Sequence, residues 1–203
     1  MQEKITVAFT EEPEENIPLQ HKSANIETAA EPDIENQSTP ERHALVELTP
    51  DTWQKYKEAR LRSKETDPQA FGTNVMAETG ETGEAYWRDK LNDPNIRMFA
   101  IEIDGKIAAM AGLQKKNDGR FLLRRVYTTP EMRGKGFGKV LIERIFAEAK
   151  SSGAKSIELD VAEGQDSAIG LYQKLGFEEF KRKDATKGDG KVHTEIFMRK
   201  ILQ

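Results

Sequence analysis

The segment that decides the fold runs from Val126 to Lys139 and reads VYTTPEMRGKGFGK. It begins as a hydrophobic strand, turns through closely spaced glycines and continues into an amphipathic helix over residues 137–150. Glycines let backbone N–H groups approach a ligand closely, because no Cβ lies in the way. The N-terminus of the following helix adds unpaired N–H donors and the positive end of a dipole. The segment therefore predicts an anion site suited to phosphate.

Two common phosphate-binding motifs do not fit this turn. The loop that binds nucleoside triphosphates requires Gly-Lys followed by Ser or Thr, but Val140 follows Lys139. Its first glycine would stand at Arg133. The dinucleotide fingerprint requires a glycine three positions after Gly136, where Lys139 stands. A different phosphate ligand is therefore indicated.

Two segments carry a resemblance to one known family. Residues 133–138, RGKGFG, match Arg/Gln-x-x-Gly-x-Gly/Ala, and this segment resembles the pyrophosphate loop of the GNAT superfamily of acetyl-CoA-dependent N-acetyltransferases. Residues 168–177, AIGLYQKLGF, resemble that family's Ala-x-x-Leu-Tyr-x-Lys-x-Gly-Phe segment. Both segments occur in the family's order, with a predicted helix and strand between them. In element order the resemblance covers about residues 44–200.

The resemblance implies acetyl-CoA as co-substrate, with its pyrophosphate at the glycine turn. It also implies that the oxyanion formed when the amine attacks the thioester lies near backbone N–H groups of the preceding strand. Tyr172 matches the family's usual acid, which protonates the departing thiolate. Its phenol, with an ordinary pKa of about 10, stays protonated until needed. Gln165 stands where family members often have Asn, so an amide is kept on a longer side chain. The residues implied to bind the cofactor are Val126, Tyr127, Thr128, Arg133, Gly134, Lys135, Gly136, Phe137, Gly138, Lys139 and Gln165.

The general base is not determined by the sequence. Many family members carry a Glu on the fourth strand, but residues 122–125 read LLRR and offer no carboxylate. Glu158 and Asp160 share one face of their predicted strand, and Glu102 lies on another strand. Each of the three also fits a solvated surface carboxylate, and a water chain to solvent would suffice for some amines.

Strands and helices alternate along the chain. Strands are predicted at residues 44–48, 98–103, 106–113, 121–128, 156–161, 177–181 and 192–199, and Asp104-Gly105 predicts a hairpin. Helices are predicted after Pro50 and at residues 84–91, 137–150 and 167–175, with a loop over residues 67–82. This order predicts an α/β (α+β) fold with a mixed, mostly antiparallel central sheet and helices on both faces. The resemblance implies the GNAT-like acyl-CoA N-acyltransferase fold.

Residues 1–43 differ in composition from the rest. They hold ten acidic and three basic residues, a net charge of −7, and Phe9 is their sole aromatic residue. Such a stretch buries too little apolar surface to offset its ordering entropy, so we expect a mostly disordered tail that is dispensable for chemistry. Residues 5–9, ITVAF, have strand composition and could instead pair with a sheet edge. Residues 44–203 form the predicted catalytic domain.

Composition excludes several classes of function. The 203-residue chain has no cysteine, which excludes a disulfide framework, a thiolate metal site and a cysteine nucleophile. Its three histidines are far apart, so no metal site is expected. A net charge of −4 gives no general attraction to nucleic acid. No run of 18 apolar residues predicts a membrane span, and no leader is evident, so the expected location is cytoplasmic.

These observations predict an enzyme that transfers the acetyl group of acetyl-CoA to a primary amine. The chain has no cysteine and no Gly-x-Ser-x-Gly elbow that could serve as an acyl-enzyme nucleophile. Direct attack of the amine in a ternary complex is therefore expected. The alternative is a catalytically weak acetyl-CoA-binding module that acts as a sensor or interaction protein. The acceptor, a small-molecule or peptide amine, and the state of assembly, monomer or homodimer, stay open.

Overall fold

The computed structural model describes residues 43–70, 83–186 and 190–202. The predicted tail lies outside these residues except for His43, which begins the first strand rather than ending the tail. The alternative strand at residues 5–9 and most of the loop predicted at 67–82 also lie outside the described residues.

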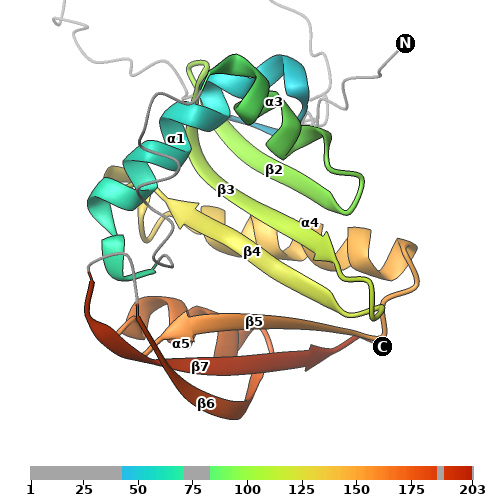
Figure 1. Ribbon diagram of the computed structural model, residues 1–203, viewed down its shortest axis with the longest axis vertical. Coiled ribbons are helices and arrows are strands. Elements are labelled where there is room, and N and C mark those ends of the chain that lie inside the picture. Colours follow the sequence, from blue (N-terminus) through green and yellow to red (C-terminus); the bar gives the residue numbers. More distant parts are fainter. Residues whose placement is uncertain (1–42, 71–82, 187–189, 203) are drawn as a thin grey trace, which may run out of the picture. The chain divides into compact units, whose positions relative to one another are not determined.

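Seven strands form one sheet in the order β1-β2-β3-β4-β5-β7-β6 (Figure 1). They are β1 (His43–Leu48), β2 (Ile96–Ile103), β3 (Lys106–Lys115), β4 (Phe121–Thr128), β5 (Ser156–Ala162), β6 (Glu178–Thr186) and β7 (Val192–Ile201). Neighbouring strands of the described sheet are antiparallel except β4 and β5, which are parallel. The predicted mixed, mostly antiparallel sheet is confirmed.

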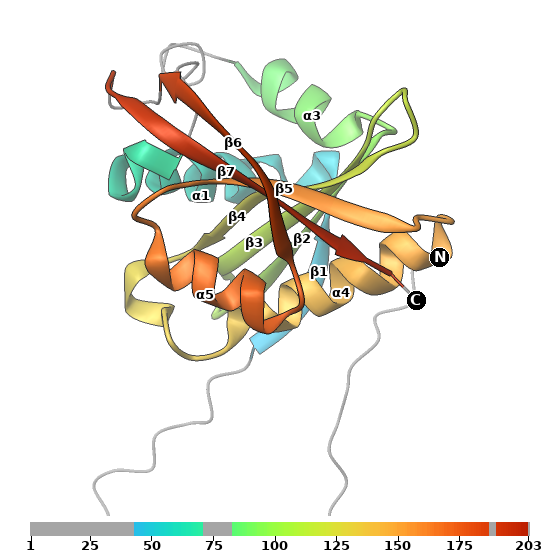
Figure 2. The same ribbon diagram turned by 90° about the horizontal axis from the view of Figure 1, so that it is seen from below.

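Helices cover both faces of the sheet. On one face lie α1 (Trp53–Thr66) and α3 (Glu84–Asn92), and on the other lie α4 (Phe137–Ser151) and α5 (Asp166–Lys174), as Figure 2 shows. Short 3-10 turns at Pro50–Thr52, Pro68–Ala70 and Pro130–Met132 join these elements. The predicted helices on both faces are confirmed, and each was placed within a few residues.

Two hydrophobic cores follow from alternation along the central strands. Phe99 and Ile101 of β2 belong to the larger core beneath α4 and α5, whereas Met98 belongs to the core beneath α1 and α3. The second core is built around Trp87, whose ring meets Tyr56 edge-on at a centroid distance of 5.9 Å. Helix α4 is the amphipathic helix predicted at residues 137–150. Its apolar side is buried, with Leu141, Ile142, Ile145 and Ala149 inside and Phe146 partly covered.

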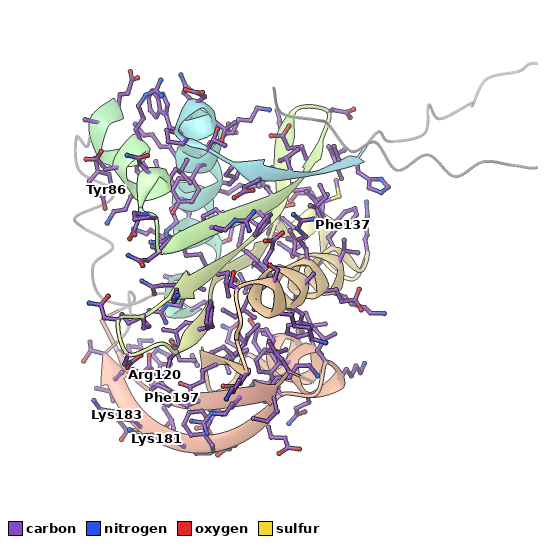
Figure 3. All side chains as sticks on the ribbon, turned by 90° about the vertical axis from the view of Figure 1, so that its right-hand side faces the viewer. Tyr86, Arg120, Phe137, Lys181, Lys183 and Phe197 are labelled. Carbon is purple, nitrogen blue, oxygen red and sulfur yellow. The ribbon has the colours of Figure 1, made fainter. Side chains whose placement is uncertain are left out.

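The half of the sheet formed by β4, β5, β7 and β6 carries charged side chains on the face that α1 and α3 cover elsewhere. Figure 3 shows Lys181 and Lys183 on the same side as Tyr86, with Phe137 on the opposite side. The edge strand β6 extends five residues beyond the predicted 177–181 segment, to Thr186. Nearly all of it is exposed, so no apolar alternation marks it in the sequence. Main-chain pairing with β7 defines it instead.

The centre of the sheet contains a β-bulge in β4 and a gap where β4 diverges from β5. Met110 pairs with Tyr127 but Gly112 pairs with Arg124, so two residues of β4 stand opposite one residue of β3. Arg125 in this bulge has φ 55°, a left-handed conformation that non-glycine residues seldom adopt. On its other side β4 pairs with β5 at residues 121 and 122 and then diverges from it. The end of β4 therefore presents an open backbone edge to the space between the two strands.

Close packing beside the bulge gives a test of this part of the fold. A methyl group at Gly112 would overlap the sulfur of Met98, so Gly112→Ala should lower the free energy of unfolding by about 1–3 kcal/mol. Gly170→Ala is the matched control, because a Cβ there meets nothing within 4 Å and alanine favours the helix. It should raise stability by up to about 1 kcal/mol. Urea denaturation measures both, and equal effects of the two changes would contradict this packing.

Candidate functional site

A cavity of about 1320 Å³ opens where β4 and β5 diverge. Its walls come from the end of β4, the glycine turn, the starts of α4 and α5, and residues of β5 and β7. Of the predicted site residues it brings together Val126, Tyr127, Thr128, Arg133, Gly134, Gly136, Phe137, Gly138, Lys139, Gln165 and Tyr172. Lys135 is the exception, since it does not line the cavity and its ammonium lies 3.3 Å from the Met132 sulfur.

The glycine turn leaves its backbone open to this cavity. Gly134 and Gly136 have φ values of 78° and 86°, and a Cβ at either position would meet nothing within 4 Å. Helix α4 begins directly after Gly136, and no side chain caps its first turn. The N–H groups of residues 137–139 are thus among the donors that an α-helix cannot pair internally. The turn has the open space and the donors that a diphosphate requires.

Positive side chains stand around the turn. The Arg133 guanidinium donates to the Thr128 carbonyl oxygen at 3.2 Å and forms an ion pair with Asp67 at 2.5 Å. These contacts hold Arg133 across the end of β4. Lys139, in the first turn of α4, lies 3.7 Å from Glu143 and is largely exposed. Both cations are therefore close to the glycine turn and able to balance a bound anion.

Tyr172 of α5 lines the cavity. Its ring is 6% exposed and meets Phe177 edge-on at 5.8 Å between ring centroids. Burial, and then the negative charge of Asp160, raise the pKa of the Tyr172 phenol. Both effects keep the hydroxyl protonated at neutral pH, and it bonds to no other described residue. Tyr172 therefore brings a protonated hydroxyl group to the cavity lining, and its role as the acid stays a prediction.

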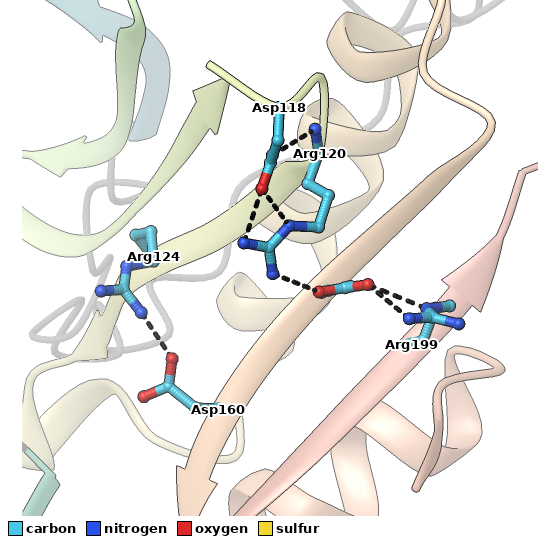
Figure 4. Close-up of polar contacts among 6 residues, drawn as sticks. Asp118, Arg120, Arg124, Asp160 and Arg199 are labelled. Carbon is cyan, nitrogen blue, oxygen red and sulfur yellow. Dashed lines mark hydrogen bonds and ion pairs between the residues drawn. The ribbon is translucent and has the colours of Figure 1, made fainter. Parts of the chain in front are cut away.

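The three carboxylates predicted as candidates for the general base differ in their position relative to the cavity. Asp160 lines the cavity, where it forms an ion pair with Arg124 at 2.5 Å (Figure 4). Glu158 lies outside the lining and accepts from Arg199 at 2.7 Å and from Arg120 at 3.4 Å. Glu102 also lies outside it and pairs with Lys55. Among the predicted candidates, Asp160 is the carboxylate that can reach a substrate in the cavity.

Sequence reasoning missed several lining residues. Glu195 of β7 reaches the cavity because β7 is in register with β5, with Glu195 opposite Ala162. This register pairs residues that are more than 30 positions apart in the sequence, so no local sequence pattern predicts it. Arg60 and Asp67 reach the cavity from α1 and the turn after it. Within residues 43–70, 83–186 and 190–202, no three His, Asp or Glu side chains gather as metal ligands would.

The sequence of the chain also resembles a known protein family. Residues 45–177 match the sequence profile of the acetyltransferase (GNAT) family. The chain belongs to the GNAT acetyltransferase family. The region of the match includes both the glycine turn and the segment with Tyr172.

Relatives of this GNAT chain are known from sequence. A [ribosomal protein bS18]-alanine N-acetyltransferase from Escherichia coli is 32% identical over 81 residues, which cover 40% of this chain and 54% of that protein. An uncharacterized N-acetyltransferase from Methanocaldococcus jannaschii is 36% identical over 98 residues, 44% of this chain and 41% of that protein. The chain spans about half the length of the curated relatives it matches.

Solved structures share the GNAT fold over most of this chain. The ribosomal-protein-S18-alanine N-acetyltransferase from Escherichia coli has a TM-score of 0.61 at 20% identity, over 80% of this chain and 95% of that one. A protein from Salmonella typhimurium determined with its cofactor acetyl-CoA has a TM-score of 0.66 at 16% identity, over the same shares of the two chains. At these identities the likeness shows the fold alone.

Within the GNAT fold, Gln165 takes its place at the start of α5. Its backbone carbonyl accepts from the N–H groups of Ala168 and Ile169, at 2.9 Å in each case. Its side chain makes no capping bond and lines the cavity. Gln165 is therefore at the cavity, and its contact with a cofactor stays a prediction.

Proposed function

We propose that this GNAT protein transfers the acetyl group of acetyl-CoA to a primary amine by direct attack in a ternary complex. One observation carries the proposal: a single cavity is lined by the open glycine turn, by Tyr172 and by Asp160. Phosphate binding, proton donation and proton acceptance are the three tasks that this reaction requires. The residues proposed for these tasks line the same cavity.

The residues present fit acetyl-CoA. Open N–H groups at residues 134–139 would hold its pyrophosphate, with the Arg133 and Lys139 side chains balancing the charge. The unpaired edge of β4 at residues 126–128 would bond to the arm of the cofactor and direct N–H groups at its carbonyl oxygen. Bound there, acetyl-CoA supplies an acetyl thioester whose C–S bond breaks as the N–C bond forms.

Two residues handle the protons. An amine attacks only when neutral, and a lysine-like amine has a pKa of about 10.4, so it must first lose a proton. Asp160 is the one of the three predicted candidates that lines the cavity, and we assign it this role. Tyr172 then donates its hydroxyl proton to the departing sulfur and recovers one from the acceptor nitrogen or solvent. The raised pKa of Tyr172 makes this hydroxyl a donor that stays loaded at neutral pH.

A catalytically weak acetyl-CoA-binding module is the second candidate function. One observation favours it, because Asp160 is already paired with Arg124 and so is not a free base. The protonated and buried Tyr172, which a binding module does not need, supports the enzyme.

The remaining features of the proposal concern partners and location. The acceptor is a small-molecule amine or a peptide N-terminus, and the relatives named for ribosomal-protein alanine support including the latter. None of the helices in the described residues is long and apolar enough to cross a membrane. A cytoplasmic protein without metal or nucleic acid, acting as a monomer or homodimer, completes the proposal.

A panel of amines tests the proposed function. Release of the CoA thiol can be followed with a thiol-reactive dye, and the protein gives no background because it has no cysteine. The panel contains polyamines, free amino acids, aminoglycosides and short peptides with free N-termini. At least one class should release CoA at a rate proportional to enzyme concentration and well above hydrolysis. Tight binding of acetyl-CoA with no release from any class would favour the binding module.

A further inference from the structure

An ion pair stands at the point where β4 and β5 separate. Leu122 and Glu158 are the last paired residues, and two positions further Arg124 and Asp160 face each other across the gap. Their side chains meet at 2.5 Å, both line the cavity, and they are 42% and 30% exposed. An acceptor amine that approaches Asp160 must therefore come close to Arg124.

The two charges of this pair belong to the cavity and not to a wider network. Figure 4 shows a separate cluster nearby, in which Glu158 holds both Arg120 and Arg199. That cluster lies outside the cavity lining. Arg124 forms no other ion pair with a described residue, so Asp160 is its whole counter-charge. A ligand that binds Asp160 in place of Arg124 therefore leaves the Arg124 guanidinium without an anionic partner.

A simple cationic amine fits this arrangement poorly. Its ammonium would attract Asp160 but would face the Arg124 guanidinium as a like charge. The exposed Arg124 guanidinium would also lose its ion-pair partner, which costs up to about fivefold in affinity (about 1 kcal/mol) for a pair of this exposure. An acceptor with an ammonium and a carboxylate side by side replaces both halves of the pair. The ammonium then faces Asp160, and the carboxylate accepts from Arg124.

We propose that the acceptor carries a carboxylate next to its amine, and that Arg124 binds this carboxylate while Asp160 faces the amine. This inference rests on the proposed function and names the substrate class for the same site. It also answers the objection that Asp160 is already paired, because the substrate's own carboxylate draws Arg124 away from it. A guanidinium suits the task, since its planar fork can donate two parallel hydrogen bonds to a carboxylate.

Two sources offer this chemistry. A free α-amino acid carries both charges on one carbon, and a polypeptide whose first residue is aspartate carries its side-chain carboxylate close to the terminal amine. A plain peptide N-terminus or a polyamine lacks the carboxylate and belongs to the disfavoured class.

Matched acids and amides test the proposal. Each free amino acid is compared with its carboxamide, and peptides beginning with aspartate are compared with the same peptides beginning with asparagine. In the unaltered protein kcat/KM should favour the acid in at least one set by roughly 10- to 100-fold. The set that shows this preference identifies the source. Arg124→Gln should reduce the ratio to near one, and Arg124→Lys should retain part of it.

Arg199→Gln is the control, because Arg199 lies on the same sheet face with similar exposure and outside the cavity. It should leave the acid-to-amide ratio unchanged. A second readout needs no turnover: calorimetry with CoA present should show the N-acetylated acid binding to the unaltered protein more tightly than its amide, and Arg124→Gln should remove the difference.

Several results would overturn the proposal. These are amides used as well as acids, a preference that survives in Arg124→Gln, or an equal loss of preference in Arg199→Gln. In each case amines are still acetylated, so the proposed function stands. Acetylation of no amine at all would instead overturn the proposed function, and this inference with it.

Discussion

Gly136→Val should weaken acetyl-CoA binding by on the order of 100-fold while the protein stays folded. Gly136 has φ 86°, and its missing Cβ leaves open space above the turn. A branched side chain would fill that space, and its backbone would avoid the left-handed conformation that directs the first N–H groups of α4 into the cavity. Loss of about 2.7 kcal/mol of binding free energy corresponds to this factor.

Gly105→Val separates backbone strain from loss of the site. Gly105 has φ 78° and equally open surroundings, but it lies in the turn between β2 and β3, away from the cavity. It should lower the melting temperature by a similar amount and leave acetyl-CoA affinity unchanged. Isothermal titration calorimetry measures the affinity of both variants. Unchanged affinity in a folded Gly136→Val protein would remove the turn from the binding site.

Tyr172→Phe should reduce turnover by on the order of 10²–10⁴-fold and change acetyl-CoA affinity little. Only the hydroxyl is lost, and the ring can still pack against Phe177. Burial and Asp160 raise the pKa of the phenol, so the unaltered protein keeps this hydroxyl protonated at neutral pH and the variant loses that donor. Steady-state turnover with a saturating acceptor, together with calorimetry for acetyl-CoA, separates the two effects.

The control for the tyrosine is Tyr86→Phe, since Tyr86 lies on α3 and does not line the cavity. It should leave turnover unchanged. Single-turnover measurement on Tyr172→Phe is needed as well, because slow product release could hide a chemical defect. A folded Tyr172→Phe protein whose single-turnover rate equals that of the unaltered protein would show that Tyr172 is not the acid.

Local patterns allowed much of the fold to be predicted from the sequence. The spacing of apolar residues placed α4, and its buried stripe is the one expected. Asp104-Gly105 marked the β2–β3 hairpin, and both residues have positive φ as that turn requires. The glycine turn and Tyr172 could be placed because their segments are contiguous in the chain. The structure brings these two segments to one cavity.

Features that depend on distant residues could not be predicted. The Arg124–Asp160 pair exists because a parallel pairing of two residues aligns β4 with β5, and this alignment leaves no mark on either strand. Glu195 enters the site through the register of β7. Lys135 was expected at the cofactor because of its place in the motif, but its side chain turns toward Met132. Side-chain direction within a turn depends on the path of the backbone, which the motif alone does not specify.

The central claim is that acetyl moves directly from acetyl-CoA to an amine in this cavity. Mass spectrometry of a reaction with isotopically labelled acetyl-CoA tests it most directly, when product and protein are analysed in the same time course. The label should appear in the acetylated amine in step with CoA release, with no labelled protein formed on the path to product. Label that appears first on the protein and then passes to the amine, or CoA release without any acetylated amine, would contradict the account.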